Sequence, residues 1–125
     1  MRQKTVAANW KMYKNPQETR SFCESLRKLL PIHMEKNVHI FPQSICIETL
    51  KVALASTNIK VGAQNCFYEN EGAFTGEISP QTLFTIGCTS VLIGHSERRS
   101  LFFETNETCH KKILKAQEHK LLPLY

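Results

Sequence analysis

Short apolar segments alternate with longer amphipathic segments along the chain, and this alternation allows few architectures. Five runs rich in Val, Ile, Leu and Ala are the expected strands: residues 5–9, 38–41, 59–64, 90–94 and 121–125. Segments with apolar side chains spaced three and four residues apart lie between them, as in helices that cover a sheet. Because strand–helix–strand repeats form parallel sheets with right-handed crossovers, we expect an α/β fold. The near-continuous apolar character of residues 5–9 predicts a first strand buried on both faces.

The expected helices carry recognisable start signals. Asn15 is placed to cap the first helix, with Pro16 at its first position and Glu18 where a capping box has its acid. The apolar stripe that follows consists of Phe22, Leu26, Leu29 and Leu30. Ser79 and Thr105 are expected to cap two later helices.

Residues 65–78 have neither helical nor strand periodicity and contain Gly72 and Gly76. The stretch is therefore a long loop, and long loops in compact domains are often functional. Its glycine spacing matches neither the dinucleotide-binding nor the P-loop pattern, so a nucleotide-binding loop is not expected.

Charge and cysteine usage exclude several classes of protein. The net charge is +5, but the basic residues are scattered among glutamates, so no nucleic-acid partner is expected. No stretch approaches the roughly 18 apolar residues of a membrane span, so no membrane partner is expected either. The five cysteines are odd in number, widely spaced and without a C-x-x-C pair. This pattern predicts no disulfide framework, no metal site and a cytoplasmic protein.

Polar residues follow the first and fourth expected strands at the point where each strand ends. Asn9 and Lys11 follow the first strand, and His95 and Glu97 follow the fourth. Ligands of parallel α/β proteins bind at the carboxyl ends of the strands, so these side chains are expected on one rim. Lys11 could hold an anion there. A neutral His95 at the start of a helical turn could donate a hydrogen bond to a carbonyl oxygen that gains negative charge.

The same residues have ordinary structural explanations. A single histidine after a strand is more often a hydrogen-bonded loop residue than a catalyst. Arg98 and Arg99 are expected to form ion pairs with nearby glutamates, namely Glu77, Glu97 or Glu104. Residues 94–98 begin like a nucleophile elbow, but Arg98 stands where that motif has its final glycine, so a serine hydrolase is not expected.

Four segments together resemble the N-terminal half of the triosephosphate isomerase family. They are residues 8–12 (Ala-Asn-Trp-Lys-Met), 62–65 (Gly-Ala-Gln-Asn), 72–79 (Gly-Ala-Phe-Thr-Gly-Glu-Ile-Ser) and 93–99 (Ile-Gly-His-Ser-Glu-Arg-Arg). They occur in the family's order and spacing. The resemblance implies a (β/α)8 TIM barrel, of which residues 1–125 supply about the first half as part of a single domain, with no second domain.

The resemblance also implies an activity. The family interconverts dihydroxyacetone phosphate and D-glyceraldehyde 3-phosphate, in glycolysis and gluconeogenesis, through an enediolate and without a cofactor or metal. By position, Asn9 and Lys11 match the substrate-binding pair, and Lys11 faces the substrate anion. His95 matches the electrophile that polarises the carbonyl group, and Glu97 matches a supporting acid near the lysine and the histidine.

A homodimer is a further implication of the resemblance. In the family the loop matching residues 65–78 enters a pocket of the other subunit, and the residue matching Thr75 reaches the partner's active site. Gln64 and Glu97 lie near that contact, and Glu77 and Arg98 match an ion pair. Phe74 on a loop would also be an unusual exposed side chain for a monomer.

The general-base glutamate implied by the resemblance has no counterpart in these 125 residues. Because general-base catalysis is commonly worth about a hundredfold or more, we expect this stretch alone to be nearly inactive. Five strands also cannot close an eight-stranded barrel, which would leave strand edges open. The stretch is then a partial sequence, a truncated product, or a half-barrel that pairs with a complement, and we favour the first because the active-site residues present keep the family's chemistry.

Two other functional classes remain open. One is a catalytically inactive half-barrel that acts only as an interaction fragment, through the 65–78 loop and the open strand edges. The other is a different phosphosugar-binding enzyme of strand–helix repeats. Such an enzyme should lack the combination of this loop with His95, Ser96 and Glu97, so its fit to the sequence is poor.

Overall fold

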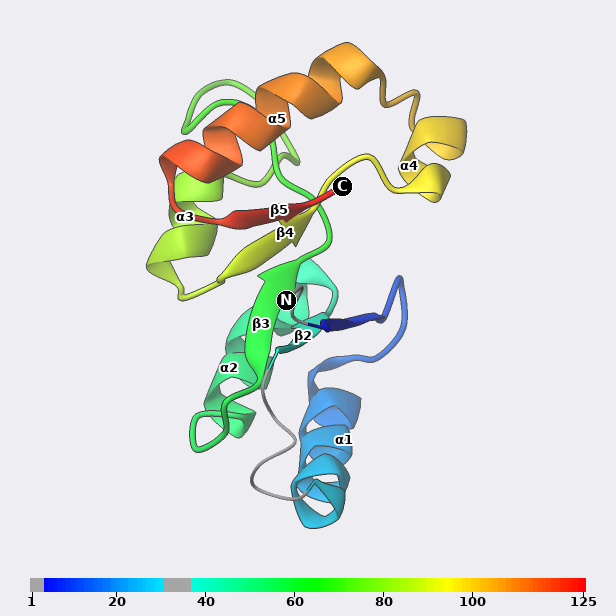
Figure 1. Ribbon diagram of the computed structural model, residues 1–125, viewed down its shortest axis with the longest axis vertical. Coiled ribbons are helices and arrows are strands. Elements are labelled where there is room, and N and C mark those ends of the chain that lie inside the picture. The colour runs from blue at the N-terminus through cyan, green and yellow to red at the C-terminus, as the bar shows by residue number, and fades with distance from the viewer. Residues whose placement is uncertain (1–3, 31–36) are drawn as a thin grey trace.

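The computed structural model describes residues 4–30 and 37–125, and within them five strands form one parallel sheet (Figure 1). The strands are β1 (Val6–Asn9), β2 (Val38–Phe41), β3 (Lys60–Ala63), β4 (Ser90–Leu92) and β5 (Leu122–Leu124). Each strand pairs in parallel with the next one along the chain, in the order β1-β2-β3-β4-β5. The sheet is curved from β1 to β5, so the expected α/β fold is confirmed in the form of about half a TIM barrel.

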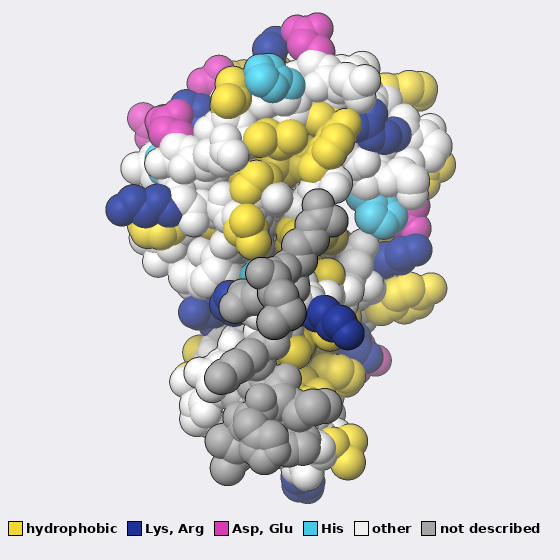
Figure 2. Space-filling view, viewed as in Figure 1, with side chains coloured by type: hydrophobic (Ala, Val, Ile, Leu, Met, Phe, Trp, Pro, Cys, Tyr) yellow, Lys and Arg dark blue, Asp and Glu magenta, His cyan; other side chains and the backbone are white. Residues whose placement is uncertain are grey.

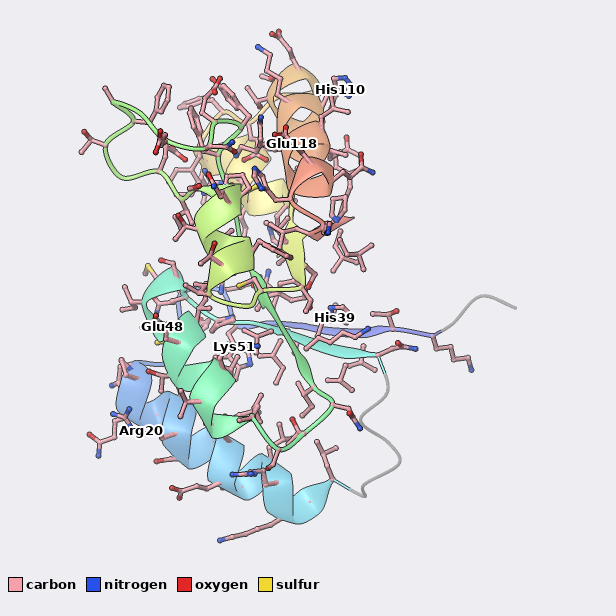
Figure 3. All side chains as sticks on the ribbon, turned by 90° about the vertical axis from the view of Figure 1, so that its left-hand side faces the viewer. Arg20, His39, Glu48, Lys51, His110 and Glu118 are labelled. Atoms are coloured by element: carbon pink, nitrogen blue, oxygen red, sulfur yellow. The ribbon has the colours of Figure 1, made fainter. Side chains whose placement is uncertain are left out.

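Helices connect the strands on the outer side of this curled sheet. They are α1 (Pro16–Leu29), the 3-10 turn η1 (Ser44–Cys46), α2 (Ile47–Ala53), α3 (Pro80–Thr85), α4 (Ser96–Leu101) and α5 (Asn106–Glu118). The first two α-helices lie side by side at one end of the molecule, and α5 lies along β5 at the other (Figures 1 and 3). None of the helices in the described ranges is long and apolar enough to cross a membrane.

The predicted helix starts are confirmed. The Asn15 side chain accepts a hydrogen bond from the Glu18 amide, and the Glu18 carboxylate accepts one from the Asn15 amide, at 2.9 and 2.8 Å. Ser79 and Thr105 cap α3 and α5 in the expected way. The predicted apolar stripe of α1 needs one correction, because Leu29 is 78% exposed. Thr19 and Cys23 are the buried residues of this helix, since they lie about two turns and one turn before the inward-facing Leu26.

The main core lies between the sheet and the helices. Its strand residues are Ile40, Val61, Ala63 and Val91, with Ile93 directly after β4, and its helix residues include Ile47, Leu50, Leu83 and Ala116. All five cysteines are buried as free thiols. On the other face of the sheet, a Cβ added to Gly62 would clash with the Phe41 ring and would lie 2.6 Å from Ser90 Oγ. Only glycine therefore fits between the buried side chains of the neighbouring strands β2 and β4.

The expectation that the first strand is buried on both faces is wrong. Val6 is 61% exposed and no residue of β1 is buried. The reason is position, because β1 forms one edge of the sheet in the described part of the chain and β5 forms the other. Leu122 of β5 is also 52% exposed. Figure 2 shows hydrophobic side chains gathered on the face of the molecule that carries β5.

Candidate functional site

The carboxyl ends of β1, β3 and β4 surround a cavity of about 380 Å³. Its lining includes the four residues that the sequence predicted for one rim, namely Asn9, Lys11, His95 and Glu97, together with Gln64. The fold therefore brings two predicted pairs of polar residues, more than 80 positions apart in the sequence, to the same opening. A cavity of this size suits a small-molecule ligand.

The backbone of Lys11 is held from both sides in a left-handed conformation, with a φ of 52°. The Asn9 Oδ1 atom accepts a hydrogen bond from the Lys11 amide at 2.9 Å, and Gln64 Nε2 donates to the Lys11 carbonyl oxygen at 2.8 Å. Gln64 also donates to the carbonyl oxygen of Phe41 at 2.8 Å. A left-handed conformation costs about 1 kcal/mol for a residue with a side chain, so these bonds offset local strain. The family resemblance places Gln64 near a partner subunit. In the structure its side chain also binds the backbone of the candidate anion-binding residue, Lys11.

Lys11 and Glu97 form an ion pair at the mouth of the cavity. The Lys11 Nζ atom lies 2.6 Å from Glu97 Oε1, and both side chains are about half exposed. The hydrogen bond and the charge of Glu97 raise the pKa of Lys11, and the hydrogen bond from Lys11 lowers the pKa of Glu97. Both groups therefore stay charged near neutral pH. The ammonium has further donor hydrogens with which an anion in the cavity can bind.

His95 caps the helix that follows β4. Its Nδ1 atom accepts a hydrogen bond from the Glu97 amide at 3.2 Å. A nitrogen that accepts a hydrogen bond carries no hydrogen, so in this arrangement the ring is neutral and its hydrogen lies on Nε2. The ring is 31% exposed and lines the cavity. It can therefore offer an Nε2–H donor to a ligand.

The turn that presents His95 is clamped by charged side chains. Glu104 Oε1 accepts a hydrogen bond from the Gly94 amide at 3.0 Å, and Arg99 Nε donates to the Gly94 carbonyl oxygen at 2.9 Å. Gly94 has a φ of +71°, which glycine adopts without strain. Both backbone groups of the residue before His95 are thus fixed by side chains from the following segment. The sequence named Glu104 and Arg99 only as ion-pair formers, because nothing local indicates which backbone groups they bind.

Glu104 is also the centre of a buried charge cluster. Its side chain is 3% exposed, and its Oε2 atom lies 2.8 Å from Arg98 Nε and 3.0 Å from Lys112 Nζ. These two cations and the Gly94 amide outweigh the effect of burial and lower the pKa of Glu104 to about 2. The prediction that Arg98 and Arg99 pair with nearby glutamates is confirmed for Arg98 with Glu104. It is wrong for Arg99, whose guanidinium in the described residues binds the Gly94 carbonyl oxygen and the side chains of Asn106 and Tyr125 instead. The expected pair between Glu77 and Arg98 does not form within the described single chain, because Arg98 is turned to Glu104.

The loop of residues 65–78 contains no helix or strand, as predicted. Its ends are joined by a hydrogen bond from the Phe67 amide to the Ile78 carbonyl oxygen at 2.8 Å. Residues 71–77, which include the predicted contact residues Phe74, Thr75 and Glu77, are all exposed. Phe74 is 42% exposed, with its ring centroid 4.6 Å from that of Phe67. The loop therefore presents an exposed tip that carries an aromatic ring.

Other known proteins are similar to this sequence over nearly its whole length. The family model described as triosephosphate isomerase matches residues 4–125. The triosephosphate isomerase of Onion yellows phytoplasma is 48% identical over 122 residues, which are 98% of this chain and 44% of the relative. That of Dictyoglomus turgidum is 47% identical over 125 residues, which are 100% of this chain and 50% of the relative. The chain spans about half the length of the curated relatives it matches.

Proposed function

The chain belongs to the triosephosphate isomerase family, and from this premise we propose that the full-length protein interconverts dihydroxyacetone phosphate and D-glyceraldehyde 3-phosphate in glycolysis and gluconeogenesis. By the full-length protein we mean these 125 residues with the remainder of their coding sequence. The observation that carries the proposal is the meeting of Lys11, Glu97 and His95 at one cavity, although Lys11 and Glu97 are 86 positions apart. The proposal places all 125 residues in one barrel domain of a cytoplasmic enzyme that needs no cofactor or metal.

In this proposal Lys11 binds the phosphate-bearing substrate. Its ammonium is a fixed positive charge at the cavity mouth, and the contact with Glu97 leaves hydrogens free for a second anion. Asn9 and Gln64 form hydrogen bonds with the backbone of Lys11 and so fix the position from which its side chain extends into the cavity mouth. Asn9 also lines the cavity and can contact the substrate directly.

His95 serves as the electrophile of the proposed reaction. When a base removes the proton from the carbon next to the carbonyl group, the electron pair of that C–H bond moves towards the carbonyl oxygen. The oxygen gains negative charge, and an Nε2–H donor held at the cavity stabilises that charge. The ring is neutral in the observed arrangement, so it can donate this proton to one enediolate oxygen and recover it from the other. The general base comes from the other half of the enzyme.

Glu97 links the two groups in a supporting role. Its carboxylate binds the Lys11 ammonium and its backbone amide binds the His95 ring. One residue therefore orients both the anion-binding lysine and the electrophile. The homodimer forms in this proposal through the 65–78 loop, whose exposed tip carries Phe74, Thr75 and Glu77.

Replacing Lys11 by Met in the full-length protein should weaken triose phosphate binding by about 10- to 100-fold, because a charge-assisted hydrogen bond to the anion is lost. Titration calorimetry with dihydroxyacetone phosphate, together with the KM, measures the change. Lys14→Met is the matched control, since the Lys14 ammonium lies 5.5 Å from the Trp10 ring centroid and 5.2 Å from that of Phe22, on side chains outside the cavity lining. Equal losses in the two variants would contradict an anion-binding role for Lys11.

A second candidate is an inactive half-barrel that only binds a partner, and the exposed tip of the 65–78 loop with its half-exposed Phe74 ring supports it. In that case the cell would contain a stable 125-residue product without isomerase turnover. Detection of the intact product by mass spectrometry, with an activity assay on the same fraction, distinguishes the two functions.

A further inference from the structure

We propose that α5 is a scaffold that holds the 65–78 loop in the shape in which its exposed tip enters a second copy of this chain. The inference rests on the proposed homodimer and adds to it the residues that prepare the loop for binding. We call residues 65–70 the limb of the loop and residues 71–77 its tip. The loop lies beside α5 in both ribbon views (Figures 1 and 3).

Side chains from one face of α5 contact the limb at three points. Lys112 Nζ donates to Asn65 Oδ1 at 2.8 Å, and His119 Nε2 lies 2.7 Å from Asn70 Oδ1. Lys111 Nζ lies 5.5 Å from the Tyr68 ring centroid. His119 follows the two lysines by seven and eight positions, which is about two helical turns, so all three side chains lie along the same side of the helix.

The Phe74 ring joins the tip to the limb, and a hydrogen bond within the tip helps to shape it. The Phe74 amide donates to the Gly72 carbonyl oxygen at 2.9 Å, and the Phe74 ring packs on Phe67. Gly72 has a φ of +142°, and a Cβ there would lie 2.7 Å from the Phe74 ring, so the glycine lets the ring fold back towards the limb. The tip therefore takes its position from the limb, and the limb takes its position from α5.

This arrangement affects binding through the cost of ordering the loop. A loop that is already fixed in its bound shape loses less conformational freedom when it binds, and its affinity is correspondingly higher. Removing an α5 contact should therefore weaken association without changing any side chain of the tip. His119 is the most informative of the three, because it contacts the limb residue nearest the tip and is not among the residues that line the catalytic cavity.

The experiment compares His119→Ala with His110→Ala in the full-length protein. His110 is exposed on the same helix, away from the loop (Figure 3), and is the matched control. We expect the dimer dissociation constant, from analytical ultracentrifugation, to rise about tenfold in His119→Ala and to stay unchanged in His110→Ala. Hydrogen–deuterium exchange of the amides of residues 66–77 should become faster in His119→Ala alone. His119→Gln keeps an N–H donor, so its dimer dissociation constant and the exchange rates of residues 66–77 should be close to those of the wild type.

The two readouts separate failure of this inference from failure of the proposed dimer. A wild-type protein that turns over substrate yet stays monomeric at every concentration would overturn the second copy as the partner of the loop. Unchanged exchange of residues 66–77 in His119→Ala would overturn the scaffold, whatever the oligomeric mass. Equal effects of His119→Ala and His110→Ala would also overturn it, because they would indicate a general loss of helix stability.

Discussion

His95→Ala in the full-length protein is expected to lower kcat by at least about 100-fold while KM changes only a few-fold. In the proposed reaction the Nε2–H group of His95 donates to the substrate carbonyl oxygen, and its contribution grows as that oxygen gains charge in the transition state. The same group adds little to binding of the neutral carbonyl. Steady-state kinetics in both directions of the reaction measure the two constants.

A second variant separates catalysis from the structural part that His95 plays as a helix cap. The ring accepts a hydrogen bond from the Glu97 amide, so His95→Ala also removes a cap. His95→Asn supplies another good cap acceptor but no donor at the position of Nε2. We expect His95→Asn to restore thermal stability and to leave turnover low. Recovery of turnover together with stability, or equal losses in kcat and in substrate binding, would contradict the electrophile role.

Glu104→Gln is expected to lower the free energy of unfolding of the full-length protein by about 3 kcal/mol or more, because it leaves the buried cation of Lys112 without a carboxylate. Chemical denaturation measures this loss. Glu107→Gln is the matched control, since its exposed carboxylate pairs with the half-exposed Lys111 on α5, and its loss should have no measurable effect on the free energy of unfolding. If the two substitutions lower the free energy of unfolding by the same amount, the buried cluster does not stabilise the fold.

Removing the buried cation as well should recover part of the loss. In the double variant Glu104→Gln, Lys112→Met, the uncompensated charge is gone, so the combined cost should be smaller than the sum of the two single costs. Strict additivity would show that Glu104 and Lys112 do not interact. The double variant also tests the cluster if Glu104→Gln alone fails to fold.

The contribution of Glu104 should depend on pH in a definite direction. Its pKa is lowered from 4.5 to about 2 in the folded protein, so the folded state binds its proton less readily than the unfolded state does. The stabilisation is therefore fully present above pH 4.5 and is lost as the pH falls from 4.5 towards 2. The stability difference between the wild type and Glu104→Gln should shrink over that interval. A difference that stays constant down to pH 2 would contradict the lowered pKa.

Local signals predicted the elements of the fold well. Helix caps depend on residues within one turn, and the Asn15 capping box could therefore be identified before any tertiary contact was known. The rim of polar residues was also predictable, because parallel strands place their carboxyl ends at one edge of the sheet. Lys11, His95 and Glu97 follow such ends and do line one cavity.

Features that depend on distant partners were not predictable. Gln64 lies beneath Lys11, 53 positions away, and no local pattern indicates that contact. The Glu104 carboxylate accepts a hydrogen bond from the Gly94 amide, ten positions away, and this contact depends on how the intervening segment folds. The exposure of Val6 follows from the edge position of β1, whereas the apolar composition of the strand is typical of a central position.

The isomerisation of D-glyceraldehyde 3-phosphate by the full-length wild-type protein, followed by proton NMR with a chelator and no added cofactor, tests the central claim most directly. We predict conversion to dihydroxyacetone phosphate until the two triose phosphates reach equilibrium, with the isolated 125 residues nearly inactive under the same conditions. A folded full-length protein that binds triose phosphate but does not interconvert the two compounds would contradict the proposal that Asn9, Lys11, His95 and Glu97 form part of an isomerase active site.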